Sequence, residues 1–355
     1  MGEGVTLSRT INQDEAARQT TYADFVNSLQ GGHNLSAGGR RPFPPRRLFA
    51  VAPAGPMWFN RFLSNVSLGS DIMRISLCVL ALVAVPLPAW ADDVDDLLRT
   101  AQIALRKGDS QAALKAAEKA VETDPKNHRC YFVRGEVFAH QRQPAEAIKD
   151  FDKAVDLDKT FVIAVDRRGG EQFKLGKVKE SIDDFNTFIK ASPKDEAAHW
   201  RRGISFYYAG EYDKGAKQFV DGQIAYGTDV ENAFWHYLCV AKKDGLEKAR
   251  KGILPIEAKA GEKFPDTRVP MKEVYDLIRG KAKAADVLAA AEQSKLDGAD
   301  QNEALFYANL YVALNYEAEG DAAKCQEHIT AAVGKKISHY MWDVANVHLK
   351  LMKKP

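Results

Sequence analysis

The chain has 355 residues, with 50 Lys and Arg against 48 Asp and Glu, so its formal net charge is only +2. That balance argues against a nucleic-acid wrapper or a polybasic membrane binder, because both need an excess of positive charge. With 45% hydrophobic and 28% charged residues the chain can bury a core, which excludes global disorder. The four cysteines are too few and too far apart for a disulfide framework or a paired-cysteine zinc site.

Residues 1–72 differ in composition from the rest of the chain. From Met1 to Ala91 there are eight Arg and no Lys, and Gly- and Pro-rich runs occur at 38–39, 42–45 and 53–56. Pro- and Gly-rich sequence without periodicity cannot pack a core. We therefore expect 1–72 to be a disordered extension or the product of a start codon placed too far upstream.

Residues 73–91 are predicted to be a secretory signal peptide. A Met-Arg start at 73–74 is followed by an apolar run at 75–85 and an Ala-Trp-Ala cleavage site at 89–91. The run is too short for a membrane span of about 20 residues. We expect translation to start at Met73, cleavage to follow Ala91, and the mature protein to be periplasmic or secreted, without stable membrane insertion. The alternative is a real extension ahead of a signal-anchor helix.

A 34-residue period begins after the predicted cleavage site. Small residues recur in one register at Gly135, Gly169 and Gly203. Aromatic residues recur in a second register at Phe151, Phe185 and Phe219. This spacing predicts pairs of antiparallel helices, in which a small residue lets the helices approach and an aromatic ring fills the space between repeats. Positive φ is expected at the turns within the pairs, at Gly108, Gly176 and Gly210.

The pattern resembles the tetratricopeptide repeat family over residues 92–352. The resemblance implies an all-α fold, a right-handed superhelical solenoid of helix-turn-helix repeats. By this register, 92–227 contain four repeats, and 228–355 form a divergent helical region with a C-terminal capping helix. Helices in the divergent region are expected at 232–238, 246–253, 271–279, 284–291, 303–319, 322–333 and 337–352.

The divergent region carries a second resemblance. The run Tyr-Asp-Leu-Ile-Arg-Gly at 275–280, Glu-x-x-Phe-Tyr at 303–307 and Gly-Asp at 320–321 are similar to the bacterial outer-membrane adaptors called new lipoprotein I. That resemblance implies a periplasmic platform that brings peptidoglycan hydrolases and a processing protease together. Lipid anchoring is not implied, because Leu77, which precedes Cys78, is not the small residue that a lipobox requires.

No catalytic motif is present in the sequence. HExxH, GxSxG, GxGxxG and Walker A patterns are absent, and the histidines have no ligand spacing with cysteines or carboxylates. We therefore predict a protein that is not an enzyme and has no catalytic residues, no cofactor and no metal. His199 is expected in the core, and Cys130, Cys239 and Cys325 are expected to be buried thiols. A nucleophilic role for Cys325 lacks an evident base.

The family resemblance also implies a partner-binding groove lined by the first helix of each repeat. Mapped through the register, the predicted groove residues are Arg129, Phe132, Asp166, Lys174, Trp200, Ile204 and Tyr208. Aromatic residues beside arginines are typical of interface hot spots, although they are also common in repeat packing. A ladder of arginines recurs once per repeat at Arg134, Arg168 and Arg202. The ladder could bind acidic partners or pair with neighbouring carboxylates.

The resulting functional hypothesis is an exported, non-catalytic adaptor that binds a protein or peptide partner in this groove, in envelope maintenance. Nucleic acid is not expected as a partner. One alternative is a structural protein that forms homo-oligomers through its terminal helices. Another is an enzyme whose site lies in the divergent half, near Cys325 and His328, although no motif supports it.

Overall fold

The computed structural model describes residues 93–256 and 263–353. The predicted extension (1–72) and signal peptide (73–91) lie outside the described residues. Every regular element within the described residues is a helix, so the predicted all-α class is confirmed. Within these residues, no helix combines the length and apolar character needed to cross a membrane.

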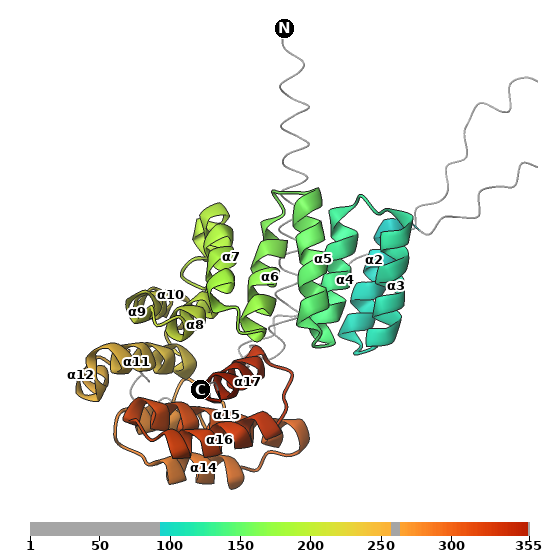
Figure 1. The fold of residues 1–355 in the computed structure, drawn as a ribbon. Coiled ribbons are helices and arrows are strands. Elements are labelled where there is room, and N and C mark those ends of the chain that lie inside the picture. Colours follow the sequence, from blue (N-terminus) through green and yellow to red (C-terminus); the bar gives the residue numbers. More distant parts are fainter. Residues whose placement is uncertain (1–92, 257–262, 354–355) are drawn as a thin grey trace, which may run out of the picture. The chain divides into compact units, whose positions relative to one another are not determined.

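The first part of the described chain is a stack of four helix pairs (Figure 1). The pairs are α2 (Val94–Arg106) with α3 (Ser110–Thr123), α4 (His128–His140) with α5 (Pro144–Leu157), α6 (Val162–Lys174) with α7 (Val178–Ala191), and α8 (Trp200–Tyr208) with α9 (Tyr212–Asp221). A short 3₁₀ helix, η1 (Pro193–Asp195), precedes α8. Each second helix packs on the first helix of the next pair, which is the arrangement expected of a repeat solenoid.

The predicted small and aromatic registers meet inside these pairs. A Cβ atom on Gly135 would lie 2.7 Å from the Phe151 ring, and one on Gly203 would lie 2.7 Å from the Phe219 ring. Real side chains cannot approach so closely, so only glycine allows the two helices this separation. Phe151, Phe185 and Phe219 are all buried, as predicted.

The turns within the pairs use left-handed backbone conformations. Gly108, Gly176 and Gly210 have φ of 76°, 76° and 75°, as expected. Arg142 occupies the same register position in the second repeat and has φ of 59°. A residue with a side chain is disfavoured in this conformation by about 1–2 kcal/mol, so other contacts must hold Arg142 there.

The divergent half is also helical. Its helices are α10 (Gln223–Tyr226), α11 (Val230–Asp244), α12 (Leu246–Lys251), α13 (Met271–Ile278), α14 (Ala284–Glu292), α15 (Gly298–Glu319), α16 (Ala322–Gly334) and α17 (Tyr340–Met352). Helix α15 begins at Gly298, earlier than the predicted 303. The Gln301 side chain donates to the carbonyl of Ala291 at 2.9 Å and so joins the first turn of α15 to the end of α14.

A single hydrophobic core joins the divergent half to the later repeats. It includes Phe173 and Ile204 from the repeats and large aromatic side chains such as Trp235 and Tyr311 from the divergent half. Helix α17 contributes a buried apolar face, with Met341, Val344, Ala345 and Val347. The last helix therefore does more than cap the end of the chain.

Candidate functional site

Helix α17 lies against the side of the repeats that carries the predicted groove residues. It packs on α6, the first helix of the third repeat. The Tyr340 ring stacks on Phe173 with 5.8 Å between centroids, and its edge meets the Trp200 ring of α8 at 5.5 Å. Gly170 on α6 leaves room for the neighbouring Arg201 side chain, since a Cβ atom there would lie 3.2 Å from Arg201 Nη1.

An arginine of the second repeat contacts the first turn of α17 and the segment that leads into it. Arg142 Nη1 donates to Asp343 Oδ1 at 2.8 Å, and Nη2 donates to the carbonyl of Ile337 at 2.5 Å. The guanidinium also lies 4.1 Å from the centroid of the Trp342 ring. Lys174 Nζ approaches the same carboxylate, 3.8 Å from Asp343 Oδ2. These contacts offset the cost of the left-handed backbone at Arg142.

The Asp166 carboxylate interacts with two other side chains of this protein. His199 Nε2 lies 2.9 Å from Asp166 Oδ1, and Arg201 Nη2 donates to Oδ2 at 2.7 Å. Burial on its own raises the pKa of Asp166, but the charge of Arg201 and the hydrogen bond to His199 outweigh it and hold the pKa well below its usual value. His199 is buried, as predicted. Asp166 is therefore a buried ionised side chain whose acceptors are already used.

The expectation of an open groove at repeats three and four is corrected by this packing. Ile204 is only 1% exposed and belongs to the shared core, while Trp200 and Tyr208 are partly buried against it. With Asp166 and Lys174, these residues are brought together next to α17, so the chain itself occupies the face that they were predicted to offer a partner.

The two predicted groove residues of the second repeat have different environments. Phe132 is fully buried between the rings of Phe151 and Phe161, at centroid distances of 5.7 and 5.1 Å, so it is a packing residue. Arg129 is 42% exposed and donates to Asp95 on α2 at 2.7 Å. Arg129 thus stays accessible, and its role in binding a partner stays a prediction.

Each arginine of the ladder pairs with a side chain on the second helix of its own repeat, and Arg168 also donates to Asp152 on α5 of the preceding repeat at 2.7 Å. Arg134 forms a two-pronged pair with Asp150 at 2.8 and 2.7 Å. Arg168 does the same with Asp184 at 2.8 and 2.6 Å. Arg202 donates to Gln218 at 2.9 Å. Of the two roles left open by the sequence, the structure shows pairing with neighbouring side chains, both within a repeat and between repeats.

Sequence reasoning did not identify α17 as the occupant of this face. One signal was available, because Arg142 stands at the register position that Gly108, Gly176 and Gly210 occupy in the other repeats. A side chain at a position that favours glycine indicates a compensating contact. The identity of that contact, Asp343 in α17, cannot be read from spacing.

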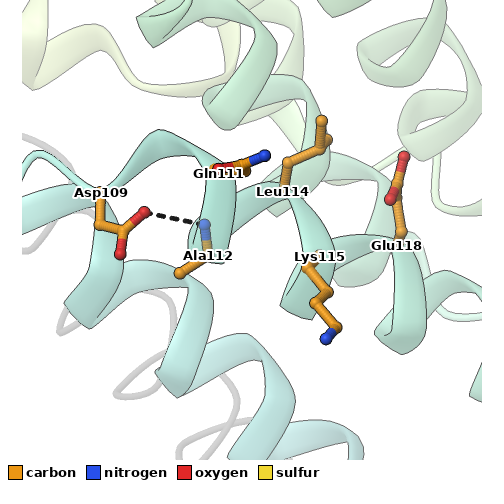
Figure 2. A pocket seen from close by; sticks show the side chains of 6 residues that line it. All are labelled: Asp109, Gln111, Ala112, Leu114, Lys115 and Glu118. Carbon is orange, nitrogen blue, oxygen red and sulfur yellow. Dashed lines mark hydrogen bonds between the residues drawn. The ribbon is translucent and has the colours of Figure 1, made fainter.

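A separate hollow lies at the start of α3 (Figure 2). Its lining residues are Asp109, Gln111, Ala112, Leu114, Lys115 and Glu118. Asp109 Oδ1 accepts from the backbone N–H of Ala112 at 2.9 Å, which is the ordinary N-cap of this helix. The hollow therefore contains two carboxylates, one of them a helix cap, and one cation, without a convergent set of reactive groups.

Comparison with known proteins identifies repeats in the first part of the chain. Residues 98–160 and 167–225 match the family model described as tetratricopeptide repeat. Human DnaJ homolog subfamily C member 3 is 32% identical over 103 residues, which is 29% of this chain and 20% of that protein. Human serine/threonine-protein phosphatase 5 is 29% identical over 90 residues, which is 25% of this chain and 18% of that protein. The chain thus spans only about a fifth of the length of these curated relatives.

Solved structures include similar helical proteins. A tetratricopeptide repeat protein from Parabacteroides merdae superposes with a TM-score of 0.49 and 15% identity, over 74% of this chain and 99% of that chain.

Proposed function

Because residues 98–160 and 167–225 are tetratricopeptide repeats, we propose that this protein is an exported, non-catalytic scaffold that binds a protein or peptide partner. The observation that carries the proposal is the position of α17 on α6 and α8. A helix distant in the sequence is held there by aromatic rings, an ion pair and buried apolar side chains, which are the interactions that anchor partners at interfaces. This face of the repeats is therefore suited to holding a helix.

The accessible part of the same side lies on α2 and α4. Arg129 and Asp95 form an exposed pair between these helices, with 42% and 60% of their side chains accessible. A partner segment carrying both charges could exchange with this pair at little cost, because exposed ion pairs contribute only about 0–1 kcal/mol. We assign the partner contact to this part of the repeats.

Site-specific photo-crosslinking tests the assignment. A photoreactive amino acid at position 129 should capture a discrete partner in cells. The same amino acid at Lys149, an exposed position on the second helix α5, provides the matched control and should capture little. Absence of a product from position 129, or the same products from both positions, would contradict the proposal.

Export is the second part of the proposal. It is supported by the Met-Arg start at 73–74, the apolar run at 75–85 and the Ala-Trp-Ala site at 89–91. Residues 73–93, fused ahead of a reporter that is active only after export, should carry it across the inner membrane with cleavage after Ala91. Replacing Leu80 and Leu82 by Asp should abolish export. Reporter activity that survives this change would count against the signal peptide.

A role in envelope maintenance rests on the resemblance of 275–321 to the outer-membrane adaptors. If it holds, the partner captured from position 129 will be a protein that acts on peptidoglycan or processes such an enzyme. A captured partner outside this class would leave the scaffold proposal intact and reject the envelope role.

A further inference from the structure

Three side chains with soft or borderline metal-ligand atoms meet between α16 and α17. Cys325 Sγ lies 3.5 Å from His348 Nε2 and 3.7 Å from Met352 Sδ. His348 and Met352 are four residues apart on α17 and therefore share one face of that helix. Cys325 is on α16, so the packing of the two helices assembles the group.

The orientation of the imidazole is set by a contact on its far side. Tyr208 Oη lies 3.1 Å from His348 Nδ1, which leaves Nε2 directed to the thiol. Metal-bound histidines typically have such an outer partner, which fixes the tautomer and the ring orientation. Glu317 Oε2 also faces His348 Nε2, at 4.0 Å, but the carboxylate already accepts from Tyr207 Oη at 2.7 Å and pairs with Lys242 Nζ at 2.8 Å.

The two separations that involve the Cys325 sulfur fit one shared ion. Bonds of about 2.0–2.3 Å at near-tetrahedral angles place neighbouring donors roughly 3.5–3.8 Å apart. The two separations from Cys325 Sγ, 3.5 and 3.7 Å, fall in this range. A metal could therefore enter with small side-chain movements.

We propose that Cys325, His348 and Met352 form a binding site for Cu(I). Thiolate and thioether sulfurs suit Cu(I), and imidazole also suits copper. The usual protein ligands of zinc are Cys, His, Asp and Glu, whereas the third donor of this set is a thioether. Among the described residues there is no group of three or more His, Cys, Asp or Glu side chains that could hold a metal, so the thioether is what completes this set. On binding, Cys325 sulfur forms the bond to Cu(I) and its thiol proton passes to solvent.

The alternative of a Cys–His nucleophile is disfavoured by the same environment. Burial raises the pKa of Cys325 to about 12 and lowers the pKa of His348. A raised thiol pKa leaves less of the nucleophilic thiolate at neutral pH.

Met352 is the most accessible of the three donor residues, so we expect an ion to enter the site from its side. Cys325 is fully buried and His348 is 4% exposed, whereas Met352, in the last turn of α17, is only partly buried. An ion from solvent would meet the Met352 sulfur first and then the two buried donors. This inference is independent of partner binding by the repeats.

Competition with a chromophoric Cu(I) chelator under anaerobic, reducing conditions tests the site in the full chain. One Cu(I) should bind per chain, and X-ray absorption should report two sulfur donors and one nitrogen donor. Zn(II) should not displace the copper. Absence of binding at one equivalent, or a spectrum without sulfur donors, would overturn the proposal.

Variants separate the site from general thiol binding. Met352→Leu preserves apolar volume at a partly buried position, so the fold should be retained. It should weaken Cu(I) binding by about tenfold or more and reduce the sulfur count from two to one. Cys325→Ser should abolish binding. The matched control, Cys130→Ala, removes another buried thiol and should leave Cu(I) affinity unchanged. Unchanged affinity and sulfur count in Met352→Leu, or loss of binding in Cys130→Ala, would reject the site.

Discussion

The four repeats and the divergent half reach stability in different ways. In the repeats, helices contact mainly their neighbours in the chain, and the same small–aromatic pair recurs at each interface. In the divergent half, α11 contacts α8, α9, α13 and α15. Aromatic side chains from segments that are distant in the sequence pack together there in one core. Periodic packing makes each repeat locally predictable, whereas a convergent core depends on all of its segments together.

The largest expected effect is the loss of a repeat aromatic. Phe185→Ala should cost about 3–5 kcal/mol of unfolding free energy, because Phe185 is fully buried and its ring lies against Gly169. Urea denaturation provides the measurement, and hydrogen exchange should report weakened protection in the helices next to α7. Thr187→Ala, at an exposed position of the same helix, should stay within about 0.5 kcal/mol. A loss of less than about 1 kcal/mol of unfolding free energy in Phe185→Ala would contradict nearest-neighbour packing of the repeats.

A smaller effect is expected where the two regions meet at Arg142 and Asp343. A double-mutant cycle with Arg142→Gly and Asp343→Asn should give a coupling free energy of about 1.5–3 kcal/mol, as hydrogen bonds between charged groups do when they are largely buried. Glycine retains the left-handed turn, so the cycle isolates the contact with α17. Denaturant unfolding of the four proteins measures it. Additive effects would imply that α17 does not depend on this pair.

The turn glycines should have a more modest effect. Gly176→Ala should cost about 1–2 kcal/mol, because Gly176 has φ of 76° and the cost is backbone strain alone. In the divergent half, Gly334→Ala provides the contrasting control, since Gly334 ends α16 without a positive φ and has no neighbour within 4 Å of an added Cβ. That change should be neutral or stabilising by up to about 1 kcal/mol. Equal costs in thermal unfolding would contradict the assigned turn.

The smallest expected effect is a pH dependence confined to the divergent half. Burial, with the neighbouring charge of Glu231, raises the pKa of Asp229 to about 6, although Arg268 opposes the shift and Asp266 adds to it. A carboxyl whose pKa is raised by folding binds its proton more tightly in the native state. Its contribution to stability is therefore lost as pH rises from about 4 to 6.

Asp229→Asn tests this dependence. The amide can still accept the N-cap hydrogen bond from Glu231 N–H but does not titrate. Relative to the wild type, the variant should gain about 1 kcal/mol of unfolding free energy between pH 5 and pH 7. Denaturant titrations at the two pH values measure the gain. A constant difference between the two proteins would mean that Asp229 has an ordinary pKa.

The sequence by itself determined the repeat architecture. Helix geometry ties residue spacing to direction, so a 34-residue period was enough to predict the glycine turns at Gly108, Gly176 and Gly210 and the burial of Phe151, Phe185 and Phe219. These features depend on contacts within one repeat or with the next. The expected start of α15 was late, because its first turn is stabilised by a contact with α14.

Only the tertiary structure decided what covers the repeats and which side chains meet in the divergent half. The predicted groove residues Trp200 and Tyr208 lie next to α17, and His348 lies beside Cys325, although no spacing links these positions. Such pairs form when a helix far along the chain docks, and docking depends on the shape of the whole core. Local periodicity carries no information about that shape.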